Sequence, residues 1–212
     1  MTSRIRQTWW RRERLAIALL PLILVAAIAA SSSRVHDFWW ARGFHSEGPI
    51  TAAGVATVDT RYDDGFLTYP IRAKISLTSA APVTELPDAY GPLKIPTGSR
   101  LWLVDLAWSA DPDLALTGCN VALVDRDGNR YDASINAFEA NAPIVYDACV
   151  PDDARGPVPT VGSTKAPALP AGQPPRPESY STTAYVIVPV DVRPVAARVW
   201  WFLPDYVELP LS

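Results

Sequence analysis

An uncharged apolar run near the N-terminus constrains this chain more than any other feature. Residues 15–30 read LAIALLPLILVAAIAA, and three serines extend the uncharged run to residue 33. A helix over residues 15–33 is about 28 Å long, close to the roughly 30 Å hydrocarbon core of a bilayer. We therefore predict a transmembrane helix over residues 15–33, in contact with the lipid bilayer.

Tryptophan residues flank this run on both sides. Trp9 and Trp10 precede it, and Trp39 and Trp40 follow it. Amphipathic indole rings accumulate at the two interfaces of a membrane, so the pairs favour an uncleaved anchor. The competing interpretation is a cleaved signal peptide, because a basic start, an apolar run and small residues fit that pattern too.

The distribution of charge predicts the orientation. Residues 1–33 contain five Arg and one Glu, whereas residues 34–212 carry a net charge of -7. Basic residues stay on the cytoplasmic side, which makes residues 1–14 a cytoplasmic Arg-rich tail. Residues 34–50 become a membrane-proximal segment and 51–212 an extracytoplasmic domain, so we expect a single-pass protein of the cell membrane. An acidic domain without a basic patch argues against nucleic-acid partners.

The extracytoplasmic part shows strand chemistry rather than helical periodicity. Ile71, Ala73, Ile75 and Leu77 alternate with polar residues, as in a half-buried strand. The nearly continuous apolar run 101–108 indicates a central strand covered on both faces. Further strands are expected at residues 54–60, 120–124, 130–133, 184–190 and 197–203, with 205–211 as an extension of the last. About seven short strands predict an all-β, antiparallel, immunoglobulin-like sandwich preceded by one transmembrane helix.

A segment rich in proline interrupts the strand pattern. Residues 151–180 contain eight Pro and three Gly, which leaves too few backbone donors for a sheet or a helix. We predict an exposed, extended or disordered loop here. It is either a functional element or a spacer.

Cys119 and Cys149 are the two cysteines of the chain. Both fall in the exported part, where an oxidising compartment favours a disulfide. The spacing lacks the C-x-x-C form typical of redox-active pairs.

The sequence predicts no catalytic residue, cofactor or metal site. Asp125, Asp127 and Asn129 lie in an acidic turn, but their spacing departs from that of a calcium-binding loop. The two histidines, His36 and His45, belong to no recognisable motif. We therefore expect a protein that is not an enzyme, with an unrecognised hydrolase as the remaining alternative.

Trp200 and Trp201 are the candidate contact residues. Neighbouring residues of a strand point to opposite faces, so one of the two indoles should look away from the main core. It either packs under the Pro-rich loop or a second layer, or it forms a possible contact surface for a protein or a sugar.

The stretches 101–134 and 184–203 carry a family resemblance. An alternating apolar strand, an Asp-Gly turn, a Tyr-containing strand and a late strand pair follow one another there. This order resembles immunoglobulin-like extracytoplasmic domains on lipoproteins and membrane-anchored proteins of Gram-positive bacteria. The resemblance implies an extracytoplasmic sandwich without catalytic residues. The chain departs from it by lacking a lipidation Cys after the apolar run and by inserting the Pro-rich loop.

These features predict a non-enzymatic, membrane-anchored interaction module, such as an accessory subunit of an envelope complex. Its partner would be another membrane or envelope protein. The alternative is a binding module for a sugar, a cell-wall polymer or a small ligand.

Overall fold

The computed structural model describes residues 14–63, 65–83, 95–133, 147–160 and 162–211, without the side chains of residues 14–17, 33 and 37. Nearly all of the predicted cytoplasmic tail, residues 1–13, lies outside the described residues. The chain divides into two compact units, Met1–Gly43 and Phe44–Ser212.

The first unit is helical. Helix α2 (Arg14–Val35) continues through Pro21 and leads into a π-helical turn, η1 (His36–Trp40). The prediction of a helix over residues 15–33 is therefore confirmed. Large apolar side chains of α2 are 49% to 69% exposed: Leu19, Leu20, Leu22, Ile23, Leu24, Val25, Ile28 and Val35.

No helix within the described part of the chain combines the length and the apolarity needed to cross a membrane. The transmembrane role of residues 15–33 stays a prediction.

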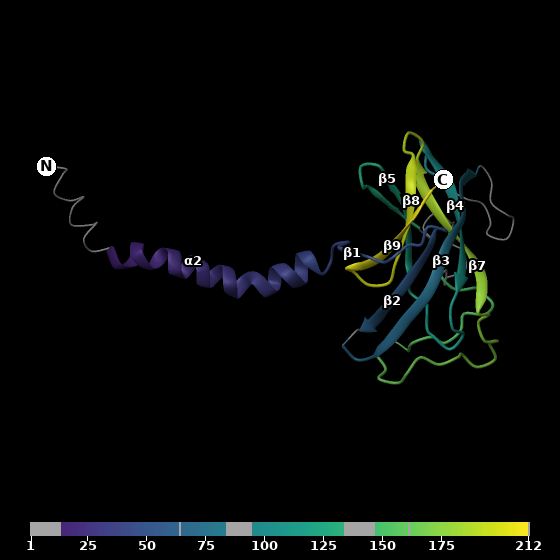
Figure 1. Cartoon of the computed structure of the whole chain (residues 1–212), viewed down its shortest axis with the longest axis horizontal. Coiled ribbons are helices and arrows are strands. Elements are labelled where there is room, and N and C mark those ends of the chain that lie inside the picture. The colour runs from purple at the N-terminus through teal and green to yellow at the C-terminus, as the bar shows by residue number, and fades with distance from the viewer. Residues whose placement is uncertain (1–13, 64, 84–94, 134–146, 161, 212) are drawn as a thin grey trace. The chain divides into compact units, whose positions relative to one another are not determined.

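The second unit consists of two sheets (Figure 1). The first has the order β2-β3-β4-β7 and is antiparallel throughout. Its strands are β2 (Val55–Asp63), β3 (Thr68–Val83), β4 (Ser99–Ser109) and β7 (Ser179–Pro189). The second has the order β1-β9-β8-β5-β6, in which only the β1 and β9 pair is parallel. Its strands are β1 (Ser46–Glu47), β5 (Asn120–Asp125), β6 (Arg130–Asp132), β8 (Pro194–Trp200) and β9 (Asp205–Pro210).

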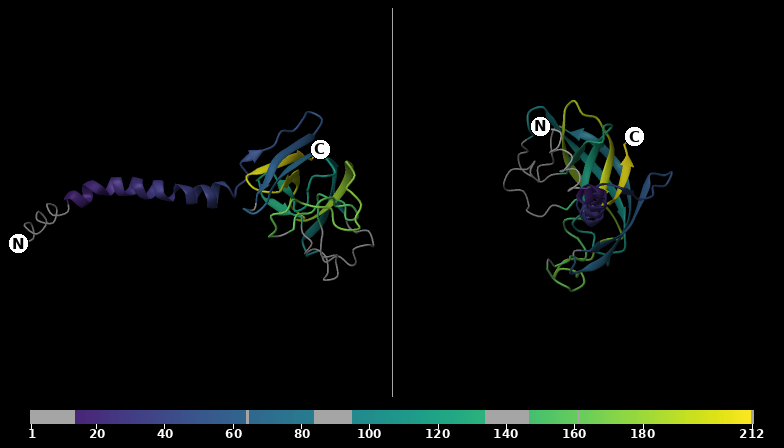
Figure 2. Two further views of the ribbon diagram at one scale, coloured as in Figure 1. Left: turned by 90° about the horizontal axis from the view of Figure 1, so that it is seen from below. Right: turned by 90° about the vertical axis from the view of Figure 1, so that its left-hand side faces the viewer.

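Alternating side chains of both sheets build one shared core. In β3, Ile71, Ala73 and Ile75 are buried while Arg72 and Lys74 are exposed, as the pattern predicted. The second sheet contributes these residues to the same core: Val121, Leu123, Ala197, Val199, Val207 and Leu209. The predicted all-β, antiparallel sandwich is thereby confirmed, and Figure 2 shows its strands from two further sides.

Two details of the strand prediction need correction. The structure has nine strands among its described residues, rather than about seven. Residues 205–211 do not extend the preceding strand, because β8 ends at Trp200 and β9 returns antiparallel beside it.

The Asp-Gly hairpin forms as predicted. Strands β5 and β6 pair antiparallel, with Leu123 opposite Tyr131. Gly128 adopts a φ of 80°, a left-handed conformation that glycine reaches without a steric penalty. An antiparallel bridge between Ala133 and Val186 then joins this end of the second sheet to β7 of the first.

Candidate functional site

Trp200 and Trp201 point to opposite faces, but neither indole is exposed. Trp201 belongs to the shared core, where its Nε1 donates a hydrogen bond of 2.9 Å to the carbonyl of Leu116. Its ring meets that of Trp108 edge to face at a centroid distance of 6.2 Å. The exposed fractions of Trp200 and Trp201 are 8% and 6%. Trp200 therefore faces away from the shared core, as expected for one of the two indoles, but it is covered rather than exposed.

Phe44 is the residue that covers Trp200. The Phe44 ring meets Trp200 at 5.1 Å and Tyr206 at 5.3 Å between centroids, both edge to face. The guanidinium of Arg130 lies over Phe44 and Trp200, and that of Arg198 lies over Phe44 and Tyr206. We call these five residues the entry cluster, because Phe44 is the first residue of the domain.

Arg198 is held in the entry cluster by an ion pair. Its Nε and Nη2 donate to one carboxylate oxygen of Glu208 at 3.0 and 2.6 Å. Burial raises the pKa of Tyr206 above its ordinary value.

Residues 34–50 were predicted only as a membrane-proximal segment, so the role of Phe44 was missed. A lone aromatic residue outside any strand pattern gives no signal of what it packs against.

A small hollow lies beside the entry cluster. It has a volume of about 250 Å³ and is lined by residues of β1, β2 and β9 together with both Trp200 and Trp201. The Thr60 hydroxyl donates to the carboxylate of Asp205 at 2.7 Å within its wall. Ligand pockets usually measure about 300 to 1,000 Å³, so this hollow fits only a small group.

A larger groove of about 550 Å³ lies at β4 and β7, and hydroxyl and carboxylate groups line it together with apolar residues such as Val150 and Pro151. Both oxygens of Asp105 accept hydrogen bonds, from Ser79 at 2.6 Å and from Thr183 at 2.7 Å. These bonds tie the Asp105 carboxylate to the neighbouring strands β3 and β7.

Cys119 and Cys149 form the predicted disulfide, with a Cα–Cα distance of 6.0 Å. Asp147 lies beside it, accepting backbone N–H bonds from Gly118 at 2.7 Å and from Cys149 at 3.0 Å. Burial raises the pKa of Asp147. The three side chains Cys119, Asp147 and Cys149 could together ligate a metal by proximity, but the disulfide consumes both thiolates, which are the ligand form of cysteine.

Asp125 closes its own turn. Its carboxylate accepts from the backbone N–H of Asp127 and Asn129 and from the Asn129 amide, each at 2.9 Å. Hydrogen bonds from Asn129 are the main cause that lowers the pKa of Asp125. This geometry matches the interpretation of the acidic cluster as a hairpin turn.

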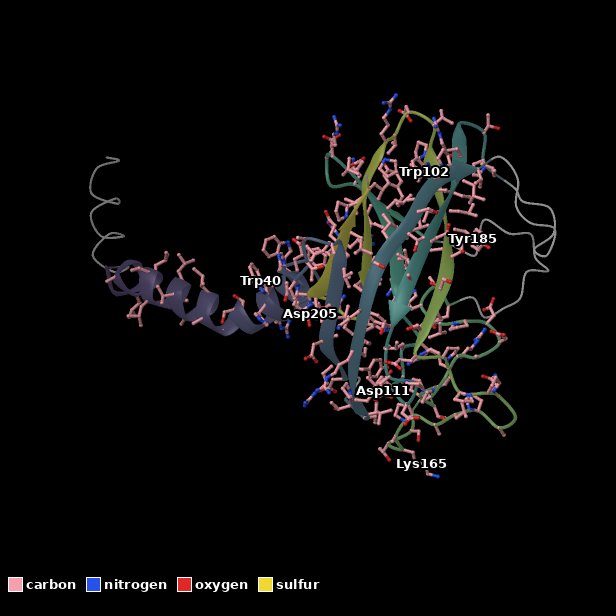
Figure 3. The ribbon with its side chains drawn as sticks, turned by 45° about the vertical axis from the view of Figure 1, so that its right-hand side comes forward. Trp40, Trp102, Asp111, Lys165, Tyr185 and Asp205 are labelled. Carbon is pink, nitrogen blue, oxygen red and sulfur yellow. A yellow bond between two sulfur atoms is a disulfide. The ribbon has the colours of Figure 1, made fainter. Side chains whose placement is uncertain are left out.

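The Pro-rich segment is irregular but has a buried anchor. Its described residues hold one isolated bridge, between Val158 and Ala168. Arg176 is only 1% exposed and donates to the carbonyl of Asp111 at 2.7 Å. Figure 3 shows Asp111 and Lys165 at the same end of the domain, away from Trp102. The prediction of an exposed loop is therefore wrong at Ala154 and at Arg176, which are both buried.

The surroundings of Arg176 leave little room. Its guanidinium carbon lies 5.6 Å from the centroid of the Tyr180 ring, and burial lowers its pKa. A Cβ added to Gly156 would lie 3.1 Å from Nη1 of Arg176. The Nε of Arg176 is buried and has no hydrogen-bond partner among the described residues. Arg176 thus packs tightly between the start of the Pro-rich segment, at Arg155 and Gly156, and the turn after β4 that contains Asp111.

Comparisons with known proteins add one distant likeness. No protein-family profile matches the chain, and no curated protein matches it. Among solved structures, it is similar to MPT63, a secreted protein from Mycobacterium tuberculosis, with 12% identity and a TM-score of 0.41. That match covers 78% of this chain and 99% of MPT63. The fold assignment rests on the strand pairing and the shared core.

Proposed function

We propose that this protein is a non-enzymatic, extracytoplasmic interaction module of the immunoglobulin-like kind, held at the cell membrane by residues 15–33. Its N-terminus is cytoplasmic and its partner is another membrane or envelope protein. The observation that carries the proposal is the apolar surface of α2, whose large side chains are 49% to 69% exposed. Soluble monomers rarely expose a continuous apolar surface of this kind, so lipid is its natural cover.

The disulfide supports the compartment. A bond between Cys119 and Cys149 persists outside the cytoplasm, where thiols are not kept reduced. The acidic balance of residues 34–212 agrees with a protein or neutral partner rather than a polyanion.

Membrane attachment is tested by adding charge to α2. Leu24 is 57% exposed in the helix and Val190 is 48% exposed in the domain, which makes them a matched pair. A charged side chain at the centre of a membrane helix costs about 2.5 to 3.5 kcal/mol. We expect Leu24→Glu to weaken the recovery of the full chain in floated membranes, while Val190→Glu leaves it unchanged. Equal recovery of the two variants would contradict the proposed anchor.

The interaction role is tested by cross-linking in intact cells, followed by capture of the full chain from solubilised membranes. We expect one or more envelope proteins to be recovered reproducibly with the wild type. A capture that yields no reproducible partner would refute the interaction module and leave the anchor standing.

The hollow beside Trp200 favours a second candidate function, the binding of a small ligand or of one sugar unit of a wall polymer. The wall combines an indole with the Thr60 and Asp205 pair. Ligand entry would change the fluorescence of Trp200. Tryptophan emission that stays constant across a panel of wall glycans would remove this candidate.

A further inference from the structure

The end of the domain at which the chain enters carries a group of exposed aromatic side chains. Phe66, in the turn between β2 and β3, is 69% exposed, and Phe202, in the turn between β8 and β9, is 40% exposed. Tyr62 joins the two turns, because its ring meets that of Phe202 edge to face at 4.6 Å. Tyr62 also stacks on Tyr69, directly opposite it in β3, at 4.6 Å. Tyr69 is itself only 6% exposed and supports Tyr62 from the core side, so we call Tyr62, Phe66 and Phe202 the aromatic tip.

Backbone hydrogen bonds place the aromatic tip at the entry point of the chain. The N–H groups of His45 and Ser46 both donate to the carbonyl of Pro204, at 3.2 and 3.1 Å. Pro204 is two residues after Phe202 in the same turn. The chain therefore enters the domain at the turn that carries Phe202.

The connection between this point and the apolar segment is short. Residues 41–45 separate the end of η1 at Trp40 from the hydrogen bonds at Pro204. Five fully extended residues span at most about 18 Å. A membrane surface that holds the N-terminal segment is therefore within reach of the aromatic tip.

We infer that the aromatic tip is a membrane-contacting surface that lies in the interfacial layer of the lipid bilayer. This inference depends on the proposed membrane anchor. Aromatic rings with an apolar body and a polar edge, such as tyrosine, prefer this layer. The contact is apolar rather than electrostatic, because residues 34–212 carry a net charge of -7 and would be repelled by anionic lipid. The occupant is thus the interface of a neutral bilayer.

The experiment uses the full chain in phosphatidylcholine vesicles, with one added cysteine that carries an environment-sensitive fluorophore. Phe66→Cys and Phe202→Cys probe the aromatic tip. Val190→Cys is the matched control. Val190 is 48% exposed and lies in the turn before β8, whereas Phe202 lies in the turn after β8, at the opposite end of the same strand. Peptide mapping of each variant verifies that Cys119 and Cys149 remain bonded to each other.

Quenching by lipids that carry a nitroxide near the headgroup reports contact with the bilayer. Interfacial groups sit about 5 to 10 Å into the headgroup boundary, so we expect at least about twofold stronger quenching at positions 66 and 202 than at position 190. High salt should leave this difference unchanged. Equal quenching at all three positions, in protein that floats with the vesicles, would overturn the inference and leave the anchor intact. Protein that does not float with the vesicles would overturn both the membrane-contacting tip and the membrane anchor. The flotation step thus separates a failure of the anchor from a failure of the tip alone.

Discussion

Two parts of the chain without a strand pattern, the entry residues 44–47 and the Pro-rich segment, are fastened to the sandwich by different chemistry. Phe44 is held by rings and guanidinium groups on the outer side of β8 and β9. The Pro-rich segment is held by the disulfide at Cys149 and by the buried cation of Arg176. The entry cluster is partly exposed and rich in weak contacts, whereas the other attachment is buried or covalent. We therefore expect the entry residues to open by local fluctuations, and the Pro-rich segment to detach only when the whole domain unfolds.

Removing the disulfide should give the largest loss of unfolding free energy among these attachments. In the chain-entropy account, closing a loop of about thirty residues stabilises the fold by about 3 to 4 kcal/mol. We expect the double variant Cys119→Ser, Cys149→Ser to lose about that much free energy of unfolding in urea denaturation. Reduction of the wild type should reproduce the loss. A loss below about 1 kcal/mol would show that the segment does not depend on its covalent tie.

Arg176 separates packing from charge. Arg176→Ala leaves a cavity and unpairs the carbonyl of Asp111, so we expect a loss of about 2 to 4 kcal/mol. Arg176→Met keeps most of the volume and removes a buried charge, which should make its loss clearly smaller. Urea denaturation measures both, and limited proteolysis within residues 151–175 should accelerate in the alanine variant. Equal losses in the two variants would mean that the charge itself stabilises the segment.

Phe44 should give a smaller and more local effect. Phe44→Ala removes two edge-to-face ring contacts and two cation contacts, and we expect a loss of about 2 kcal/mol. A double-mutant cycle with Arg198→Ala should give a coupling of about 0.5 to 1 kcal/mol, since each cation contact is worth that much. Additive losses would show that the entry cluster is not a connected unit.

The pH dependence of Asp147 is the smallest expected effect. Burial raises its pKa above the ordinary 3.8, so the folded chain holds this proton more tightly than the unfolded chain. Stability from this group therefore falls as the pH rises from near 3.8 through the raised pKa, and is constant above it. Subtracting the unfolding free energy of Asp147→Asn from that of the wild type isolates the group. A difference that rises with pH in this window would contradict the assignment.

The strands could be predicted because alternating side chains record which face is buried. The alternation of Ile71, Ala73 and Ile75 with polar residues predicted which face of the strand is buried. The Asp127-Gly128 pair predicted the hairpin turn. The disulfide could be predicted because a chain with two cysteines, Cys119 and Cys149, allows a single intramolecular pairing.

The anchors could not be predicted because their partners are remote in sequence. Phe44 packs on Trp200 and Tyr206, and Arg176 reaches Asp111, contacts that no local period encodes. Trp200 was placed on the correct side of its strand, but the sequence did not reveal that Phe44 would cover it. Strand parity therefore predicts which face a residue occupies, but not whether a residue distant in sequence covers that face.

The most direct test of a membrane-held extracytoplasmic domain is mass spectrometry of the membrane-extracted chain, after external protease treatment of intact cells and thiol alkylation. We predict an intact N-terminus, cleavage only after residue 33, and Cys119 and Cys149 protected from alkylation. A mature chain that begins near residue 30 would contradict the anchor and identify a secreted domain. Protection of the whole chain from external protease would contradict the orientation.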